Sequence, residues 1–279
     1  MKSVRYDQLP LKIDGIDVLA LNFSASQSAS LEPVYTLGRA GIHSQTPSSS
    51  RTYQASFSYV PIFQILDGSK GHGDNLTHFL KEIKENLNTN FNPFTLDIAG
   101  IQSNKSVLRS IQFSISPYSL IQFSVAFDIF GEFLGEVAAE YIDEEKSSLL
   151  EKSPNSIQAE NINPHYTRLI ASPGLDGSIL RTISYSFNVN YQPVFKVGEE
   201  FPLQILYQNA TEEVEVVETD REQDIAFRGK DSSFDIDIHT LDPDYYLNIK
   251  MLNPVIVSES TKISAGEILS SSKKLRSFY

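Results

Sequence analysis

A strand-like stretch near the start of the chain reads Phe23-Ser24-Ala25-Ser26 and continues to Leu31-Glu32-Pro33-Val34-Tyr35-Thr36-Leu37-Gly38. A second stretch has the same order, from Ile183-Ser184-Tyr185-Ser186 to Tyr191-Gln192-Pro193-Val194-Phe195-Lys196-Val197-Gly198. Serines, a Pro-Val pair, an aromatic residue, an aliphatic residue and a final glycine recur at matching places. An Asp-Gly pair precedes each stretch, at Asp14-Gly15 and Asp176-Gly177. This similarity indicates a duplicated structural unit.

Two further blocks extend the repeat in the same order. Phe94-Thr95-Leu96-Asp97-Ile98 matches Phe234-Asp235-Ile236-Asp237-Ile238, and Gly131-Glu132-Phe133-Leu134 matches Gly266-Glu267-Ile268-Leu269. A segment rich in Glu, Ser, Asn and Pro separates the copies, as expected of a solvated linker. We therefore expect a first domain at 1–142, a linker at 143–165 and a second domain at 166–279.

Strand signals dominate both copies. Apolar and polar residues alternate in 111–116, 121–125 and 234–238, which is typical of half-buried strands. One helix is expected near 76–88, where Leu76, Phe79, Leu80, Ile83 and Leu87 form one apolar stripe. The range 133–142 fits either a strand or a helix. In place of the helix, the second copy has the acidic segment Glu212–Asp224.

Composition excludes several classes of protein. The 279 residues include 23 Lys and Arg against 35 Asp and Glu, a net charge of −12, which disfavours a protein that grips nucleic acid by its phosphates. The absence of cysteine excludes disulfides, thiolate zinc sites and a cysteine nucleophile. No signal peptide or membrane span is expected, because the apolar run Val18–Leu21 is far too short. Synthesis in a cytoplasm follows.

Candidates for chemistry are weak. The five histidines are dispersed, and no G-x-S-x-G motif is present. Asp235, Asp237 and His239 would share one face of a strand, either as part of a metal site or as an ordinary polar strand face. The acidic segment is either a solvated hairpin or a surface that repels a polyanion. We expect no catalytic residues, no metal and no cofactor.

The repeated stretch resembles the first hairpin of bacteriophage tail tube proteins. In the first copy, Arg51-Thr52-Tyr53-Gln54-Ala55-Ser56-Phe57-Ser58 is similar to the next strand of that family, followed by the helix near 76–88 and the strand at 94–98. Gly131-Glu132 and Gly266-Glu267 resemble the turn before its last strand. The resemblance covers both copies, whereas ordinary tube proteins have one such domain.

The resemblance implies a mainly β chain of two tandem β-sandwich or barrel domains, the first with one helix. It implies a non-enzymatic virion protein of the tail, made in the host cytoplasm, that forms a tube ring or a ring at the tube end. The expected partners are copies of this chain, as a trimer with pseudo-sixfold symmetry or a hexamer, and other tail, baseplate or neck proteins. DNA would pass through without specific binding, and no membrane is involved.

Two sets of residues follow as hypotheses. In the family, the long loop after the first hairpin stacks one ring on the next, which suggests inter-ring contacts at Gly38, Arg39, Ile42, Thr46, Pro47, Phe201 and Leu203; a free surface loop is the alternative. A wall that repels phosphate would carry acids, with Asp97, Asp235 and Asp237 as first candidates and Glu213, Glu215 and Glu218 as second. The alternatives for the whole chain are a β-rich hydrolase or metal-dependent enzyme using Asp235, Asp237 and His239, and a receptor- or carbohydrate-binding module of the particle.

Overall fold

A computed structural model describes residues 11–18, 20–28, 31–34, 38, 44–47, 52–59, 62–63, 84, 93–98, 100–116, 122–131, 160–161, 168–172, 180–197, 199, 201–219, 233–239, 246–262 and 270–279. These residues are mainly strands: β1 (Leu11–Ile13), β2 (Ile16–Val18), β3 (Ala20–Ser28), β4 (Leu31–Val34), β5 (Ser44–Pro47), β6 (Thr52–Tyr59), β7 (Ile62–Phe63), β8 (Phe94–Ile98), β9 (Ile101–Ile115), β10 (Gln122–Ile129), β11 (Glu160–Asn161), β12 (Arg168–Ser172), β13 (Leu180–Val194), β14 (Gln204–Thr219), β15 (Ser233–His239), β16 (Tyr246–Leu252), β17 (Val255–Lys262) and β18 (Ser270–Phe278).

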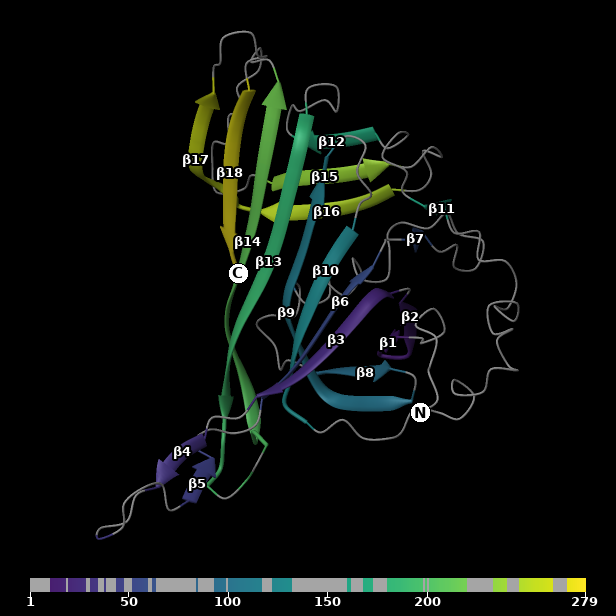
Figure 1. The fold of residues 1–279 in the computed structure, drawn as a ribbon. Coiled ribbons are helices and arrows are strands. Elements are labelled where there is room, and N and C mark those ends of the chain that lie inside the picture. The colour runs from purple at the N-terminus through teal and green to yellow at the C-terminus, as the bar shows by residue number, and fades with distance from the viewer. Residues whose placement is uncertain are drawn as a thin grey trace, which may run out of the picture.

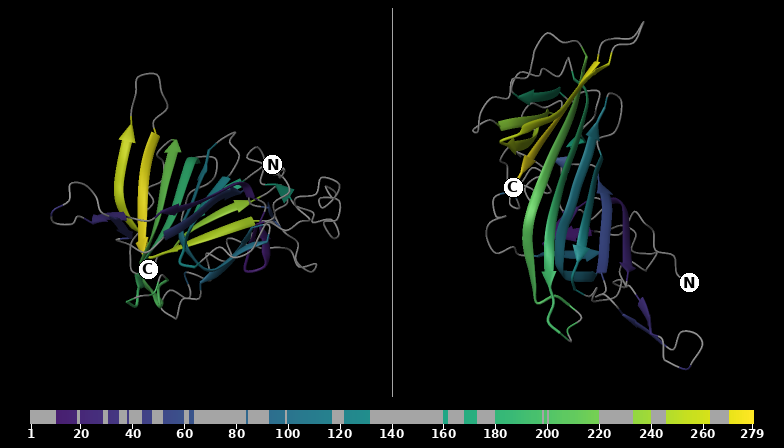
Figure 2. Two further views of the ribbon diagram at one scale, coloured as in Figure 1. Left: turned by 60° about the horizontal axis from the view of Figure 1, so that its bottom comes forward. Right: turned by 90° about the vertical axis from the view of Figure 1, so that its left-hand side faces the viewer.

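One large antiparallel sheet dominates the fold. Eight of its eleven strands lie side by side in the order β17-β18-β14-β13-β9-β10-β6-β3, and β1, β2 and β8 join it through β9. A separate three-stranded sheet has the order β12-β15-β16, and two short pairs consist of β11 with β7 and β4 with β5. The three-stranded sheet crosses the upper part of the large sheet, and β1, β2 and β8 lie by its lower part (Figure 1; Figure 2).

Alternating side chains give the large sheet one apolar and one polar face. In β13, Ile183, Tyr185 and Phe187 are buried, whereas Ser184 is exposed. The same alternation holds in β9 and β10, because successive side chains of a strand point to opposite faces. The neighbouring strands β9 and β13, at the middle of the path, therefore turn their apolar side chains to the same side of the sheet and their polar side chains to the other.

Buried residues from the beginning to the end of the chain form one hydrophobic cluster. At its centre, the ring of Phe113 on β9 lies 4.6 Å from that of Phe123 on β10 and 4.9 Å from that of Tyr185 on β13. Aromatic contacts of this kind add to the apolar burial that stabilises a sheet. Aromatic packing therefore continues across the strand pair β9–β13, which joins the N-terminal and C-terminal halves of the path.

Turn geometry explains one of the repeated Asp-Gly pairs. Asp14 and Gly15 have φ angles of 50° and 81° and connect β1 to β2, as a two-residue hairpin of the I′ type requires. The Asp14 carboxylate also accepts a hydrogen bond of 2.7 Å from the backbone N–H of Thr95, which ties this hairpin to β8. Glycine is therefore required here by the backbone and not by packing.

The mainly β fold expected from the sequence is confirmed, and the strands expected at 111–116, 121–125 and 234–238 correspond to β9 up to Ile115, to β10 from Gln122 and to β15. Of the expected helix at 76–88, only Lys84 is among the described residues, and the ambiguous range 133–142 lies outside them. Within the expected linker, Glu160–Asn161 form β11 and pair with β7. The division into two domains stays a prediction.

Candidate functional site

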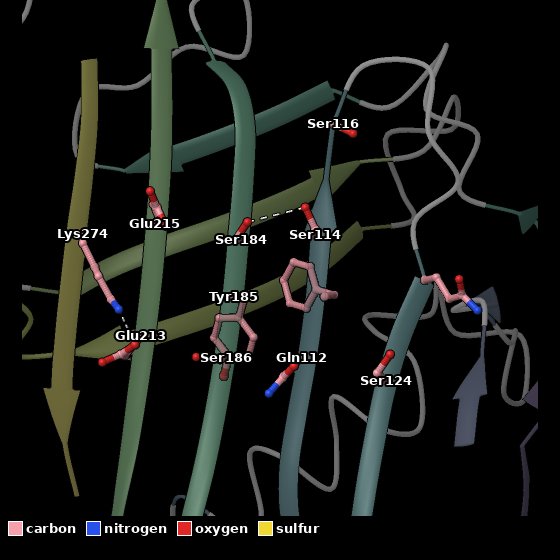
Figure 3. Close-up of a pocket in the computed structure, with 12 residues that line it drawn as sticks. Gln112, Ser114, Ser116, Ser124, Ser184, Tyr185, Ser186, Glu213, Glu215 and Lys274 are labelled. Carbon is pink, nitrogen blue, oxygen red and sulfur yellow. Dashed lines mark hydrogen bonds and ion pairs between the residues drawn. The ribbon is translucent and has the colours of Figure 1, made fainter. Parts of the chain in front are cut away.

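The solvent side of the eight-strand path is a candidate functional surface, and we call it the polar face. Two adjoining depressions of about 670 and 390 Å³ hollow it. Hydroxyl, amide and a few charged side chains line them (Figure 3). We define the polar face by the polar and charged side chains that line the depressions and by Arg276, which pairs with Glu213 on the neighbouring strand. The lining side chains are Asn22, Ser56, Ser58, Ser110, Gln112, Ser114, Ser116, Gln122, Ser124, Ser184, Ser186, Glu213, Glu215 and Lys274.

Uncharged polar groups on this face bond to one another across strands. Ser24 and Ser56 hydroxyls lie 2.7 Å apart, and Gln122 donates to the Ser58 hydroxyl at 2.8 Å. A longer contact of 3.5 Å joins Ser114 to Ser184 at the β9–β13 pair (Figure 3). Cross-strand pairs of hydroxyl side chains stabilise a sheet and leave its surface neutral.

The charged groups of the polar face gather on β14 and β18. Lys274 Nζ lies 2.8 Å from one carboxylate oxygen of Glu213, and Arg276 Nε donates to the other at 2.5 Å. Burial raises the pKa of Glu213, but the hydrogen bonds and charges of Lys274 and Arg276 outweigh it and lower that pKa below 4.5. Glu215 accepts a hydrogen bond of 2.9 Å from Ser272. The two basic groups are thus held by an acid of the same face.

A second polar group flanks this face where β9 has a bulge opposite Ala126 and Phe127. Tyr191 donates a hydrogen bond of 2.6 Å to Asp128, and Arg109 lies 3.8 Å from the other carboxylate oxygen, which has no hydrogen-bond partner. Burial is the main cause that raises the pKa of Tyr191, followed by the charge of Asp128. The bulge adds Arg109 as an extra residue of β9 and changes the direction of its side chain, which brings it near Asp128 at the end of the face.

On the apolar side of the sheet, Glu212 lies fully buried among hydrogen-bond donors. Its side chain is 0% exposed and accepts hydrogen bonds from Tyr185 at 2.7 Å, from Tyr279 at 2.5 Å and from Lys84. Burial, then the charge of Glu212, raises the pKa of Tyr185 and of Tyr279. Every donor thus matches a carboxylate oxygen, as a buried charge requires.

Lys84 reaches this cluster from a position 128 residues earlier in the chain. Its ammonium also donates to the carbonyl of Lys250 at 3.0 Å and lies 5.6 Å from the ring centre of Phe187. Burial lowers the pKa of Lys84, and the attraction of Glu212 opposes that shift. Lys84, which lies between β7 and β8 in the chain, is therefore bonded to the core beneath β13, β14 and β16.

The first three acids expected at a channel wall lie off the eight-strand path. Asp97, on β8, accepts hydrogen bonds of 2.9 Å from the backbone of Gly100 and from Gln102, so it shapes the β8–β9 turn. Asp235, on β15 of the three-stranded sheet, accepts one of 3.1 Å from Ser233, and Asp237 lies two residues further along that strand. Only the second choices, Glu213 and Glu215, lie on the polar face; the side chain of Glu218 is outside the described residues.

The described residues among the expected inter-ring contacts belong to two hairpins. Gly38 is exposed, and its φ of 89° favours glycine, while Thr46 and Pro47 belong to β5, which pairs with β4. Arg39 and Ile42 lie outside the described residues. Phe201 is half-buried and Leu203 is 76% exposed in the segment that connects β13 to β14, which also contains the fully exposed Val197. The β4–β5 pair and that segment lie at the same end of the molecule in Figure 1.

Comparison with known proteins gives no family: no family model matches the chain, and no curated protein matches its sequence. Within the described ranges, no three His, Asp or Glu side chains gather as a metal site would require. Those ranges also contain no helix long and apolar enough to cross a membrane.

Proposed function

We propose that the chain is a structural protein of a bacteriophage tail whose copies close into a ring around a channel for DNA. The observation that carries this proposal is the eight-stranded antiparallel path, which ends, within the described part of the chain, in two edge strands, β17 and β3. Exposed edges invite pairing with another chain, and a closed ring is one way to remove them. The sequence resemblance to tail tube proteins supplies the identity of the particle.

Strand order supports a duplicated unit. From β3, the first half of the path reads β3-β6-β10-β9, and the second half reads β13-β14-β18-β17. In each half, the first two strands follow the order of the chain, and the last two strands, which are β10 and β9 or β18 and β17, follow in the reverse of chain order. The strands beside the path show the same arrangement in both halves. In the first half β8 pairs with β1 and β9, and in the second half β15 pairs with β12 and β16. Two tandem units of four path strands each explain this order.

Residue register supports the same duplication. Phe23 pairs with Phe57 in the first half, and Ile183, its counterpart in the sequence repeat, pairs with Val216 in the second. Likewise Leu96 pairs with Ile13, and its counterpart Ile236 pairs with Ala171. The matched blocks thus occupy corresponding places in the two halves, β3 and β13 on the path and β8 and β15 beside it.

Under this duplication, the β9–β13 pair inside the chain is the template for a joint between chains. Its counterpart is β17 of one copy paired with β3 of the next. Every neighbouring pair in the path is antiparallel and the strands number eight, so β17 and β3 run in opposite directions. A rotation that places β3 of another copy beside β17 therefore continues the antiparallel pattern, and such head-to-tail contacts close into rings.

Three copies suit the repeat best, because six equivalent units then surround the axis. Three chains contribute 24 path strands, and at a strand spacing of about 4.8 Å the backbone circle is at least about 37 Å across. Barrels of about eight strands are filled by side chains, whereas those of about sixteen or more leave an aqueous channel. A single chain closed on itself would thus have no channel.

Size and shape of the purified assembly test the proposal. A trimer has a mass of 3 × 31.2 = 93.6 kDa. Light scattering should give this mass, or a multiple of it for stacked rings, and negative-stain electron micrographs should show an open centre. A monodisperse monomer of 31.2 kDa at every concentration would contradict it.

A further inference from the structure

The polar face contains almost no net charge, although the chain has a strong excess of acids. Among the side chains that define the face, two are acidic, Glu213 and Glu215, and two are basic, Lys274 and Arg276. The flanking pair of Asp128 and Arg109 also cancels. The net charge of −12 of the whole chain therefore arises elsewhere.

The few charges of the face are also occupied. Glu213 holds both basic groups, at 2.8 Å from Lys274 and 2.5 Å from the Arg276 Nε. A phosphate that approached either cation would have to compete with this carboxylate, which shares the same sheet and loses no freedom by staying. The strands β6, β9, β10 and β13 contribute no charged side chain to the lining of the two depressions, and their polar lining residues are serines, glutamines and Tyr185.

We infer that the polar face is an electrically balanced surface along which duplex DNA passes without being held or repelled by charge. This inference rests on the proposed ring, with the polar face turned toward the channel because the three-stranded sheet packs against the other side through Phe234, Ile236, Ile249 and Met251. Phosphate binding by proteins depends on free Lys and Arg, which displace counterions and make affinity fall steeply with salt. A face whose cations are already paired offers no such contacts. Glu213 is the residue that keeps it balanced.

A matched pair of variants tests this inference with a short linear DNA duplex and fluorescence anisotropy at several salt concentrations. The face variant is Glu213→Gln with Glu215→Gln, which frees Lys274 and Arg276. The control is Asp97→Asn with Asp235→Asn, which removes the same number of acids from β8 and β15. Both variants raise the net charge of the chain from −12 to −10, so only the location of the change differs.

The parental assembly and the control should bind the duplex weakly, with no marked salt dependence. The face variant gains two free cations per chain, or six per ring of three, so its affinity should fall about a thousandfold between about 50 and 200 mM salt. An equal gain of binding in the control, steep salt dependence in the parental protein, or no gain in an intact face variant would each overturn the inference.

Electron micrographs of the same samples separate this inference from the ring itself. If the parental protein forms no ring, the proposed function fails, and the comparison is then made on the single chain. Two freed cations predict a slope of log affinity against log salt of about −2 for the face variant and none for the control. Equal slopes would overturn the charge balance in that case too.

Discussion

Replacing Lys84 by methionine should destabilise the protein more than any exposed lysine replacement. Lys84 is 12% exposed and Glu212 0% exposed, and their ion pair is the contact of the cluster that neutralises the carboxylate. Methionine fills a similar volume without the charge. The variant therefore leaves the buried carboxylate with two hydroxyl donors, from Tyr185 and Tyr279, and no cation.

The expected loss follows from these contacts. Removing one partner of a buried ion pair costs about 3–5 kcal/mol, because the remaining charge stays desolvated. Two tyrosine hydroxyls still bond to Glu212, so we expect the lower end, about 3 kcal/mol. For a chain of this size, each kcal/mol shifts the melting temperature by about 2–4 °C, which gives a decrease of about 6–12 °C.

Differential scanning calorimetry measures this shift, with Lys105→Met as the control because Lys105 is exposed. The control should change stability by no more than about 0.5 kcal/mol. Adding Glu212→Gln to Lys84→Met removes the unpaired charge and should restore part of the lost stability. The reasoning would be refuted if Lys84→Met and the control had equal melting temperatures. It would also be refuted if the double variant melted at a lower temperature than Lys84→Met alone.

Three further predictions concern pH and assembly. The pKa values of Tyr185 and Tyr279 are raised, so above pH 10.0 the folded state keeps protons that the unfolded state loses; urea midpoints should fall as pH rises past 10, and a flat profile would be inconsistent. The pKa of Glu213 is lowered, so its stabilising contribution is present above pH 4.5 and disappears below it; Glu213→Gln should flatten the acid limb of the same urea titration. Replacing Val197 and Leu203 by serine should weaken ring stacking, seen as smaller particles by light scattering at equal concentration, without lowering the melting temperature; unchanged stacking would show that these exposed side chains make no axial contact.

Local alternation was enough to predict the strands, but not the sheet to which each belongs. The pattern at 234–238 correctly indicates β15, yet β15 joins the three-stranded sheet and not the long path. Pairing between strands far apart in the chain decides this, and alternation contains no information about it. Asp97 and Asp235 therefore looked equivalent to polar positions of the path, whereas they lie on the smaller strand groups.

The proposed duplication draws on two of the three sequence blocks. The match of Gly131 with Gly266 does not follow the strand order, because Gly131 comes after β10, whereas Gly266 precedes β18, the counterpart of β10. A Gly-Glu pair is too short to fix an alignment by itself. Under the proposed duplication, the equivalence is therefore taken from the strand pairing, which extends over whole strands.

The buried cluster was the part that the sequence hid. Alternation with Val214 and Val216 places Glu213 and Glu215 on one face and implies that Glu212 faces the core. An acid at a core position is a signal in itself, since unpaired charges are rarely buried. Its cation, Lys84, is 128 residues away, and no local pattern links the two.

Disulfide trapping tests the ring most directly, because the chain has no cysteine of its own. The β9–β13 pair sets the register: Gln112 pairs with Ser186, and their counterparts in the repeat are Ser260 on β17 and Ser26 on β3 of the next copy. Both serines are exposed, and paired residues of antiparallel strands lie about 4.5–5.5 Å apart, within disulfide reach.

A Ser26→Cys, Ser260→Cys variant should therefore give covalent dimers and trimers under oxidation and then a closed species that runs as a trimer after denaturation. Each single variant should give no ladder. The control Ser24→Cys, Ser258→Cys is off register by four residues, about 13 Å along the strand, and should stay monomeric. Crosslinking only in the control, or a denatured monomer for both pairs under oxidation, would contradict a ring closed by β17 and β3.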